Sequence, residues 1–286
     1  MERDFFMANI LDGKALAQKI RQQATEEAAA LPRQPGLAVI LVGDDPASRF
    51  YVNNKEKDCK QCGILSIEHK LPVETSEAEL LSLIGQLNVD PRVDGILVQL
   101  PVPKHIDEQK LICSINPDKD VDCFHPANVG KIMTGGGMVW PCTPFGILEL
   151  LYAYNISVAG KRCVVVGRSN IVGKPMALLL LREGGTVTIC HTKTADLAEE
   201  TRRADILIAA AGHRGLITAD MVKEGAVVVD VAMNQCEDGR FCGDVDFDAI
   251  APKAAYITPV PGGVGPMTRA VLMQNVVAAA KKNQGF

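Results

Sequence analysis

The sequence contains no long hydrophobic run and no excess of positive charge. Its strongly apolar stretches, such as residues 176–181, are far shorter than the ~20 residues that a membrane-spanning helix needs. Residues 1–6 lack the basic segment followed by an apolar core that is typical of a secretory signal. With 30 Lys and Arg against 34 Asp and Glu, the net charge is −4, which disfavours binding along nucleic acid. We therefore expect a cytoplasmic protein that binds neither a membrane nor nucleic acid.

The nine cysteines lack the pattern of a metal site. Their number is odd and no export signal accompanies them, so we expect reduced thiols. Cys59 and Cys62 form a CxxC pair, but a zinc site usually takes four ligands from two such pairs, and the sequence has no second one. We favour two thiols about one turn apart on a helix and predict no metal.

Hydrophobic patterns in the first half predict an α/β domain with a parallel sheet. Strand patterns at 37–42, 64–71 and 95–100 alternate with helical patterns at about 46–61 and 76–87. The first of these helices has an acidic residue at its N-cap and proline at its first position.

A second alternating series predicts a Rossmann-like domain. It follows residues 116–143, which are rich in Pro, Gly, Asn and Asp and which we interpret as a junction. We place the two domains at residues 7–142 and 143–265. The predicted strands are 162–166, 186–190, 206–210 and 226–231, and the predicted helices are 173–182 and 196–202.

The turn after strand 162–166 has the properties of a dinucleotide site, although it is not GxGxxG. Gly167 permits a sharp turn, and Gly173 permits close approach of helix and strand. Backbone N–H groups at the helix start can receive a pyrophosphate. An ordinary strand-to-helix turn would also explain the two glycines.

The next strand favours NADP over NAD. An NAD site usually ends this strand with an acid that binds the ribose 2′-hydroxyl, whereas residues 191–194 are His-Thr-Lys-Thr. Arg168 follows Gly167 directly, and a cation suits a 2′-phosphate. The alternative is that Arg168 and Lys193 are solvated surface charges.

Tyr51 and Lys55 share one face of the predicted helix 46–61 because they are four residues apart. A lysine in a partly dry site loses its proton more readily and can then transfer protons near neutral pH. The alternative is an unremarkable exposed helix. Short-chain dehydrogenases also carry YxxxK, but there the glycine turn precedes the motif, and here the order is reversed.

Six segments in this order resemble the methylenetetrahydrofolate dehydrogenase/cyclohydrolase family. The family oxidises 5,10-methylenetetrahydrofolate to the methenyl form with NADP and hydrolyses that product to 10-formyltetrahydrofolate. The resemblance implies an active-site cleft between the domains, a last helix at 266–284 that packs back on the first domain, and a homodimer. The segments are YVNNK at 51–55, VQLPVP at 98–103, KDVD at 119–122, PCTP at 141–144, VGRSNIVGKP at 166–175 and TPVPGGVGPMT at 258–268.

The resemblance also implies roles for polar residues of the first domain. Lys55 would transfer the proton in the cyclohydrolase step, supported by Gln99. Tyr51 would orient and stack on the folate. Asp122 would accept hydrogen bonds from the pterin ring, since a carboxylate forms strong charge-assisted bonds. Without the family, Gln99 would be a strand-end polar residue and Asp122 a loop cap.

In the second domain the resemblance implies that backbone and hydroxyl groups bind the folate and the cofactor. Missing side chains in the segment that begins at 261 let the backbone approach a flat ligand, although a plain turn before the last helix would look the same. The residues expected on the folate side are Pro261, Gly262 and Gly265. Those expected to bind NADP are Gly167, Arg168, Ser169, Thr192 and Met233.

Three positions depart from the family. Cys123 stands where glycine is usual and can crowd the turn. Ala232 also replaces glycine, and Met233 replaces a branched residue of similar volume. Two other classes stay open: a non-catalytic NADP-binding protein, and another two-domain NADP dehydrogenase.

Overall fold

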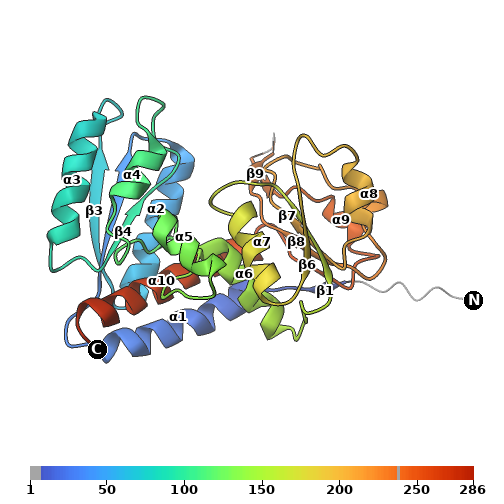
Figure 1. Ribbon diagram of the computed structural model, residues 1–286, viewed down its shortest axis with the longest axis horizontal. Coiled ribbons are helices and arrows are strands. Elements are labelled where there is room, and N and C mark those ends of the chain that lie inside the picture. The colour runs from blue at the N-terminus through green and yellow to red at the C-terminus, as the bar shows by residue number, and fades with distance from the viewer. Residues whose placement is uncertain (1–7, 237–238) are drawn as a thin grey trace, which may run out of the picture. The chain divides into compact units, whose positions relative to one another are not determined.

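The computed structural model describes residues 8–236 and 239–286, so the expected domain start at residue 7 lies outside the described residues. The chain forms two compact units, each built around one parallel sheet (Figure 1). We call them the three-stranded unit, residues 18–142 with 269–286, and the six-stranded unit, residues 8–17 with 143–268. The predicted α/β class with mainly parallel sheets is confirmed.

The three-stranded sheet has the order β3-β2-β4, with all strands parallel. Its central strand is entirely buried, which explains the unbroken apolar sequence GLAVILV. The strands are β2 (Gly36–Val42), β3 (Leu65–Leu71) and β4 (Gly95–Val98), and the helices are α2 (Pro46–Gln61), α3 (Glu77–Val89), α4 (Glu108–Ser114) and α5 (Pro126–Met133). Two more helices, α1 (Gly13–Ala29) and α10 (Val264–Asn283), belong to this unit from residues 18 and 269 onward.

Helix starts in this unit follow their capping residues. The Asp45 carboxylate accepts a hydrogen bond from Ser48 N at 2.8 Å and begins α2. Ser76 and Glu79 form a reciprocal capping box at α3. The segment 116–143, which we interpret as a junction, contains α5, and its residues up to 142 cluster with the three-stranded unit.

The six-stranded sheet has the order β1-β11-β8-β7-β5-β6, again all parallel. Its four long strands occur where the sequence predicts them. The strands are β5 (Arg162–Val166), β6 (Thr186–Cys190), β7 (Ile206–Ala209), β8 (Val227–Asp230), β11 (Tyr256–Ile257) and β1 (Asn9–Ile10). The helices are α6 (Cys142–Ala153), α7 (Gly173–Arg182), α8 (Leu197–Arg202) and α9 (Phe247–Ile250), and β9 (Asn234–Gln235) pairs with β10 (Phe241–Cys242).

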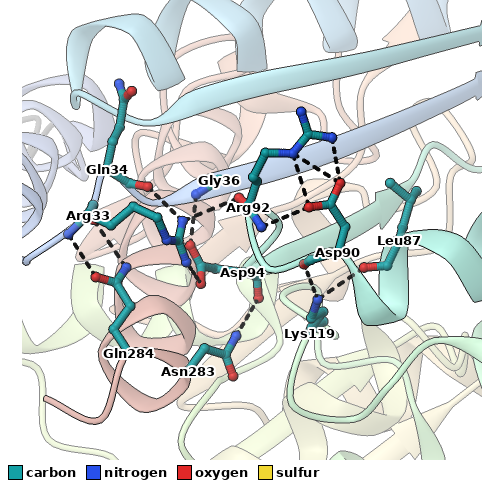
Figure 2. Close-up of polar contacts among 10 residues, drawn as sticks. All are labelled: Arg33, Gln34, Gly36, Leu87, Asp90, Arg92, Asp94, Lys119, Asn283 and Gln284. Carbon is teal, nitrogen blue, oxygen red and sulfur yellow. Dashed lines mark hydrogen bonds and ion pairs between the residues drawn. The ribbon is translucent and has the colours of Figure 1, made fainter.

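The carboxyl end of α10 is joined to the three-stranded unit by a polar network around Asp94 (Figure 2). The fully buried Asp94 carboxylate accepts hydrogen bonds from Arg33 at 2.8 Å and from Gly36 N at 2.9 Å. Asn283 donates to the Asp94 carbonyl at 3.3 Å, and the Gln284 side chain accepts from Arg33 N at 3.0 Å. The last residues of the chain therefore stabilise a strand start almost 190 positions earlier.

Lys119, the first residue of the KDVD segment, has a structural role in the same view (Figure 2). Its buried Nζ donates to the carbonyls of Leu87 at 3.0 Å and Asp90 at 2.9 Å, at the end of α3. A cation is favourable there because helix carboxyl ends carry unpaired carbonyls and a partial negative charge. Burial lowers the pKa of Lys119.

Three further properties concern membranes, thiols and metals. None of the helices in residues 8–236 and 239–286 combines the length and the apolar character needed to cross a bilayer. All nine cysteines are free thiols. The described part of the chain holds no group of three or more His, Cys, Asp or Glu side chains arranged to bind a metal.

Candidate active site

Lys55 and Gln99 meet in the three-stranded unit. Lys55 lies on α2, and its Nζ donates a hydrogen bond of 3.0 Å to Gln99 Oε1. Gln99 directly follows β4, at the carboxyl edge of the parallel sheet, where ligands of such sheets usually bind. The Gln99 amide nitrogen donates to the Leu100 carbonyl at 2.8 Å. This second bond orients the amide so that its oxygen faces the lysine.

Tyr51 lies one turn before Lys55 on the same helix. Its ring packs edge to face with Phe50, with ring centroids 6.1 Å apart. Burial raises the pKa of Tyr51, so the phenol stays protonated at neutral pH and can act as a hydrogen-bond donor. Phe50 is 54% exposed, which leaves an aromatic surface open beside the tyrosine.

Asp122 lies within electrostatic reach of Lys55. Burial raises the pKa of Asp122, and the positive charge of Lys55 opposes that shift. The Cys142 thiol contacts the Asp122 carboxylate at 3.6 Å. Burial and the adjacent Asp122 raise the pKa of Cys142 far above its usual range, so this thiol is an uncharged hydrogen-bond donor.

Two residues that sequence reasoning missed hold the Asp122 segment. The buried Asp120 carboxylate accepts hydrogen bonds from Phe124 N at 3.2 Å, His125 N at 2.9 Å and the Asn128 amide at 2.9 Å. On α10, the buried Asn275 amide donates to the carbonyl of residue 121 at 2.8 Å. The available signal for Asn275 was a polar residue inside the apolar sequence VLMQNVVAAA.

The turn that carries Asp122 has a left-handed residue at the next position, where the family resemblance leads us to expect glycine. Cys123 has φ = 60°, a left-handed conformation that costs a side-chain-bearing residue about 1–2 kcal/mol. Cys123 is also fully buried. Ala232 differs, because the described residues other than glycine with positive φ are Cys123 and Asn155 alone. The methyl group of Ala232 therefore introduces no left-handed strain.

The glycine turn of the six-stranded unit is closely packed. Gly167 has φ = 126°, and a Cβ at this position would lie 2.2 Å from the Ala210 carbonyl oxygen. A Cβ at Gly173 would lie 2.2 Å from the Gly167 carbonyl oxygen. Both positions therefore require glycine. The Ser169 hydroxyl accepts hydrogen bonds from Val172 N at 3.1 Å and Gly173 N at 3.2 Å, where α7 begins.

The end of β6 contains no free acid. Arg168, Thr192 and Lys193 are exposed near the ends of β5 and β6. The first carboxylate after β6 is Asp196, whose side chain accepts a hydrogen bond from Glu199 N at 2.9 Å as the N-cap of α8. A phosphate at this edge would therefore meet a cation and hydroxyls. Met233 is half-buried between β8 and β9.

The segment 258–265 lies in the six-stranded unit and not in the unit that holds Lys55. Gly262 has φ = 121°, and its carbonyl accepts a hydrogen bond from Gly13 N at 3.1 Å. A Cβ at Gly13 would lie 1.8 Å from the Gly263 carbonyl oxygen. Pro261 and Gly265 are exposed, whereas Gly262 is buried. The predicted site residues thus divide into two groups, one in each unit.

A glycine turn at the carboxyl edge of a parallel sheet, with a lysine–glutamine pair in a second α/β unit, defines a two-domain protein of the dinucleotide-binding class. Residues 11–122 match the catalytic domain of the tetrahydrofolate dehydrogenase/cyclohydrolase family, and residues 141–284 match its NAD(P)-binding domain. The bifunctional protein FolD of Burkholderia thailandensis is 56% identical over 278 residues, covering 96% of this chain and 98% of that protein.

Solved structures are also similar to this chain. The bifunctional FolD enzyme of Campylobacter jejuni is 51% identical with a TM-score of 0.94, over 96% of this chain and 99% of that chain. The Trypanosoma brucei enzyme, determined with NADP cofactor and an inhibitor, is 39% identical with a TM-score of 0.92, over 96% and 98%. This chain belongs to the tetrahydrofolate dehydrogenase/cyclohydrolase family.

Proposed function

We propose that this protein oxidises 5,10-methylenetetrahydrofolate to 5,10-methenyltetrahydrofolate with NADP and hydrolyses the product to 10-formyltetrahydrofolate. The observation that carries the proposal is the bond between Lys55 and Gln99, with Asp122 in electrostatic reach, in a chain of this family. A non-catalytic NADP-binding protein has no use for such a group of half-buried polar side chains. Another two-domain dehydrogenase would not need the KDVD segment beside Gln99.

The proposed roles in the three-stranded unit follow from hydrogen-bonding capacity. An ammonium has three donors, of which Gln99 takes one, so Lys55 keeps two N–H groups for substrate or water. Hydrolysis needs an activated water and a proton for the departing ring nitrogen, and Lys55 is the group proposed to move that proton. Asp122 would bind the pterin amide and amino groups, and Tyr51 would orient the folate.

NADP is the proposed cofactor of the six-stranded unit. When bound, it accepts the hydride that leaves the folate bridging carbon. The residues present fit the group: Gly167 and Gly173 leave backbone without side chains at the start of α7, and such helix starts bind phosphate. Arg168 and Thr192 would bind the 2′-phosphate, and the Ser169 hydroxyl and Met233 would contact the cofactor. Asp196 does not compete, because it caps α8.

Pro261, Gly262 and Gly265 are proposed to line the folate and nicotinamide side of the site. Hydride transfer needs the two reacting carbons about 3–3.5 Å apart, so a flat backbone surface without side chains suits this position. A homodimer is proposed from the family resemblance, and sedimentation at several concentrations tests it. A cytoplasmic location is proposed because nine free thiols fit a reducing compartment.

An absorbance assay tests the activity. Wild-type protein with 5,10-methylenetetrahydrofolate is expected to reduce NADP faster than NAD, and methenyltetrahydrofolate is expected to decay faster with the protein than without it. No turnover together with NADP binding would favour the non-catalytic alternative. Activity with a different hydroxy or amino acid substrate, and none with folate, would favour the other dehydrogenase.

Lys55→Met separates the two steps. Removing a positioned proton-transfer group typically costs about 10²–10⁴-fold, so hydrolysis of methenyltetrahydrofolate should fall by that amount, while NADP reduction stays measurable. Lys60→Met, at an exposed position near the end of α2, is the matched control and should change neither rate. Equal loss of both activities in a folded Lys55→Met protein would contradict the assigned role.

A further inference from the structure

A fully buried carboxylate lies beneath the exposed segment 211–213, which follows β7 in the six-stranded unit. One oxygen of Asp244 accepts hydrogen bonds from Ala211 N at 2.7 Å and Gly212 N at 2.9 Å. The other oxygen accepts from His213 N at 2.6 Å. Successive backbone N–H groups that converge in this way form an anion-binding concavity. Here the anion comes from the chain itself and fixes the conformation of the segment.

This segment is part of the edge where the dinucleotide is proposed to bind. β7 and β5 are parallel neighbours, so their carboxyl ends lie at the same edge of the sheet, the edge at which such folds bind ligands. The residue just before the segment, Ala210, is the one that a Cβ at Gly167 would approach to 2.2 Å. A displacement of residues 211–213 would therefore disturb the glycine turn.

Asp244 is itself held by a second buried carboxylate. Asp230, at the end of β8, accepts hydrogen bonds from Asp244 N at 3.0 Å and Val245 N at 2.9 Å. A Cβ at Gly243 would lie 1.8 Å from the Asp230 carboxylate, so glycine is required there. Asn234 adds a fourth bond to the Asp244 carboxylate, at 3.0 Å. Two carboxylates thus connect the ends of β7 and β8.

We propose that Asp244 is a positioning residue for the dehydrogenase step: it fixes residues 211–213 as a wall of the NADP site, and Asp230 holds it in place. The inference rests on the proposed function. Asp244 does not bind the cofactor directly, because it is fully buried and each of its two carboxylate oxygens already accepts two hydrogen bonds.

Asp244→Asn tests the role with little change in volume. An amide replaces one acceptor oxygen by an N–H₂ donor, so in either orientation two N–H groups of the protein face another donor. We expect KM for NADP to rise roughly tenfold or more with kcat changed less than about threefold. Hydrolysis of methenyltetrahydrofolate uses no NADP and should stay within about twofold of wild type, which reports that the protein is folded.

Two variants complete the test. Asn234→Ala removes one of the four hydrogen bonds to Asp244 and should raise KM for NADP by a smaller factor, about threefold. Asp246→Asn is the matched control, because Asp246 is exposed and only caps α9 through Ala249 N at 3.3 Å. Asparagine caps helices as well as aspartate does, so this variant should match wild type.

The possible outcomes are distinct. An unchanged KM for NADP in Asp244→Asn, or a fall in kcat alone, overturns the proposal. If that variant loses both activities, Asn234→Ala decides: a raised KM with intact hydrolysis supports the role, and an unchanged KM rejects it. If wild type shows no dehydrogenase activity, the proposed function fails. Calorimetric titration of NADP into wild type and Asp244→Asn then still tests the role, and equal affinities would reject it.

Discussion

The two units hold their candidate site residues by different means. The three-stranded unit presents side chains: a lysine held by a glutamine amide, with a carboxylate and a thiol nearby. The six-stranded unit presents backbone: glycines that leave no space for a Cβ and N–H groups organised by buried carboxylates. The first unit should therefore be sensitive to changes of functional group, and the second to the addition of a single methyl group.

Of the variants that test this difference, Gly167→Ala should have the largest effect. The added Cβ would lie 2.2 Å from the Ala210 carbonyl oxygen, and alanine disfavours φ = 126°. NADP-dependent oxidation should fall by about 100-fold or more, while methenyltetrahydrofolate hydrolysis is retained. Gly85→Ala is the control, because it lies on α3 with nothing within 4 Å of its Cβ. Normal NADP kinetics in Gly167→Ala would refute the importance of backbone packing here.

Asp94→Ala should strongly destabilise the three-stranded unit. It leaves the half-exposed Arg33 without its ion-pair partner and the buried Gly36 N without its acceptor, and a buried donor left unpaired costs about 1–3 kcal/mol. Denaturant unfolding measures the loss. Asp118→Ala, which removes an exposed ion pair with Lys282, should cost less than about 1 kcal/mol. Comparable losses in the two variants would argue against the Asp94 network.

Asp122→Ala should affect both reactions, since both use the folate. Loss of a charge-assisted hydrogen bond costs about 1.5–3 kcal/mol, so KM for each folate substrate should rise about 10–100-fold. KM for NADP should stay constant. Steady-state kinetics with each folate substrate and with NADP measure the three values. Unchanged folate kinetics would remove Asp122 from the site.

Asp230 gives the six-stranded unit a predicted pH dependence. Burial raises the pKa of Asp230 to about 6, partly opposed by hydrogen bonds from Asp244 N and Val245 N. A raised carboxyl pKa means that the folded state binds this proton more tightly than the unfolded state. The contribution of Asp230 to stability is therefore greatest at low pH and decreases as the pH rises from about 4 through about 6.

The measurement is the unfolding free energy of wild type minus that of Asp230→Asn, followed from pH 4 to 7. The difference should fall by roughly 2–4 kcal/mol across this range, because the amide does not titrate. A flat difference would show that the Asp230 carboxyl titrates normally.

Cys123→Gly is expected to have the smallest effect. Glycine relieves the left-handed strain at φ = 60°, about 1–2 kcal/mol, but removes a fully buried side chain, which costs a similar amount. Thermal unfolding should shift by only a few degrees in either direction. Cys123→Ala keeps the strain and loses the thiol, so it should be the less stable of the two. The reverse order would mean that the turn is not strained.

Pattern and capping were sufficient for the long elements, because their signals are local. Strand β5 and helix α7 occur at their predicted residues, and Asp45 caps α2 as expected. Strands β1 and β11 were not predicted, because two residues are too few to show a period, and β1 pairs with β11 across some 247 positions. The approach of Gln99 to Lys55 could be predicted only from the family resemblance.

The sequence alone determined the two α/β series, the glycine turn, the absence of an acid at the end of β6 and the spacing of Tyr51 and Lys55, since each depends on neighbours within a few residues. Tertiary structure decided the rest. Asp244 reaches back to residues 211–213, Asn275 holds the segment before Asp122, and Asp94 receives the end of α10. These contacts join distant segments through buried polar groups, and a single sequence carries no local signal that pairs them.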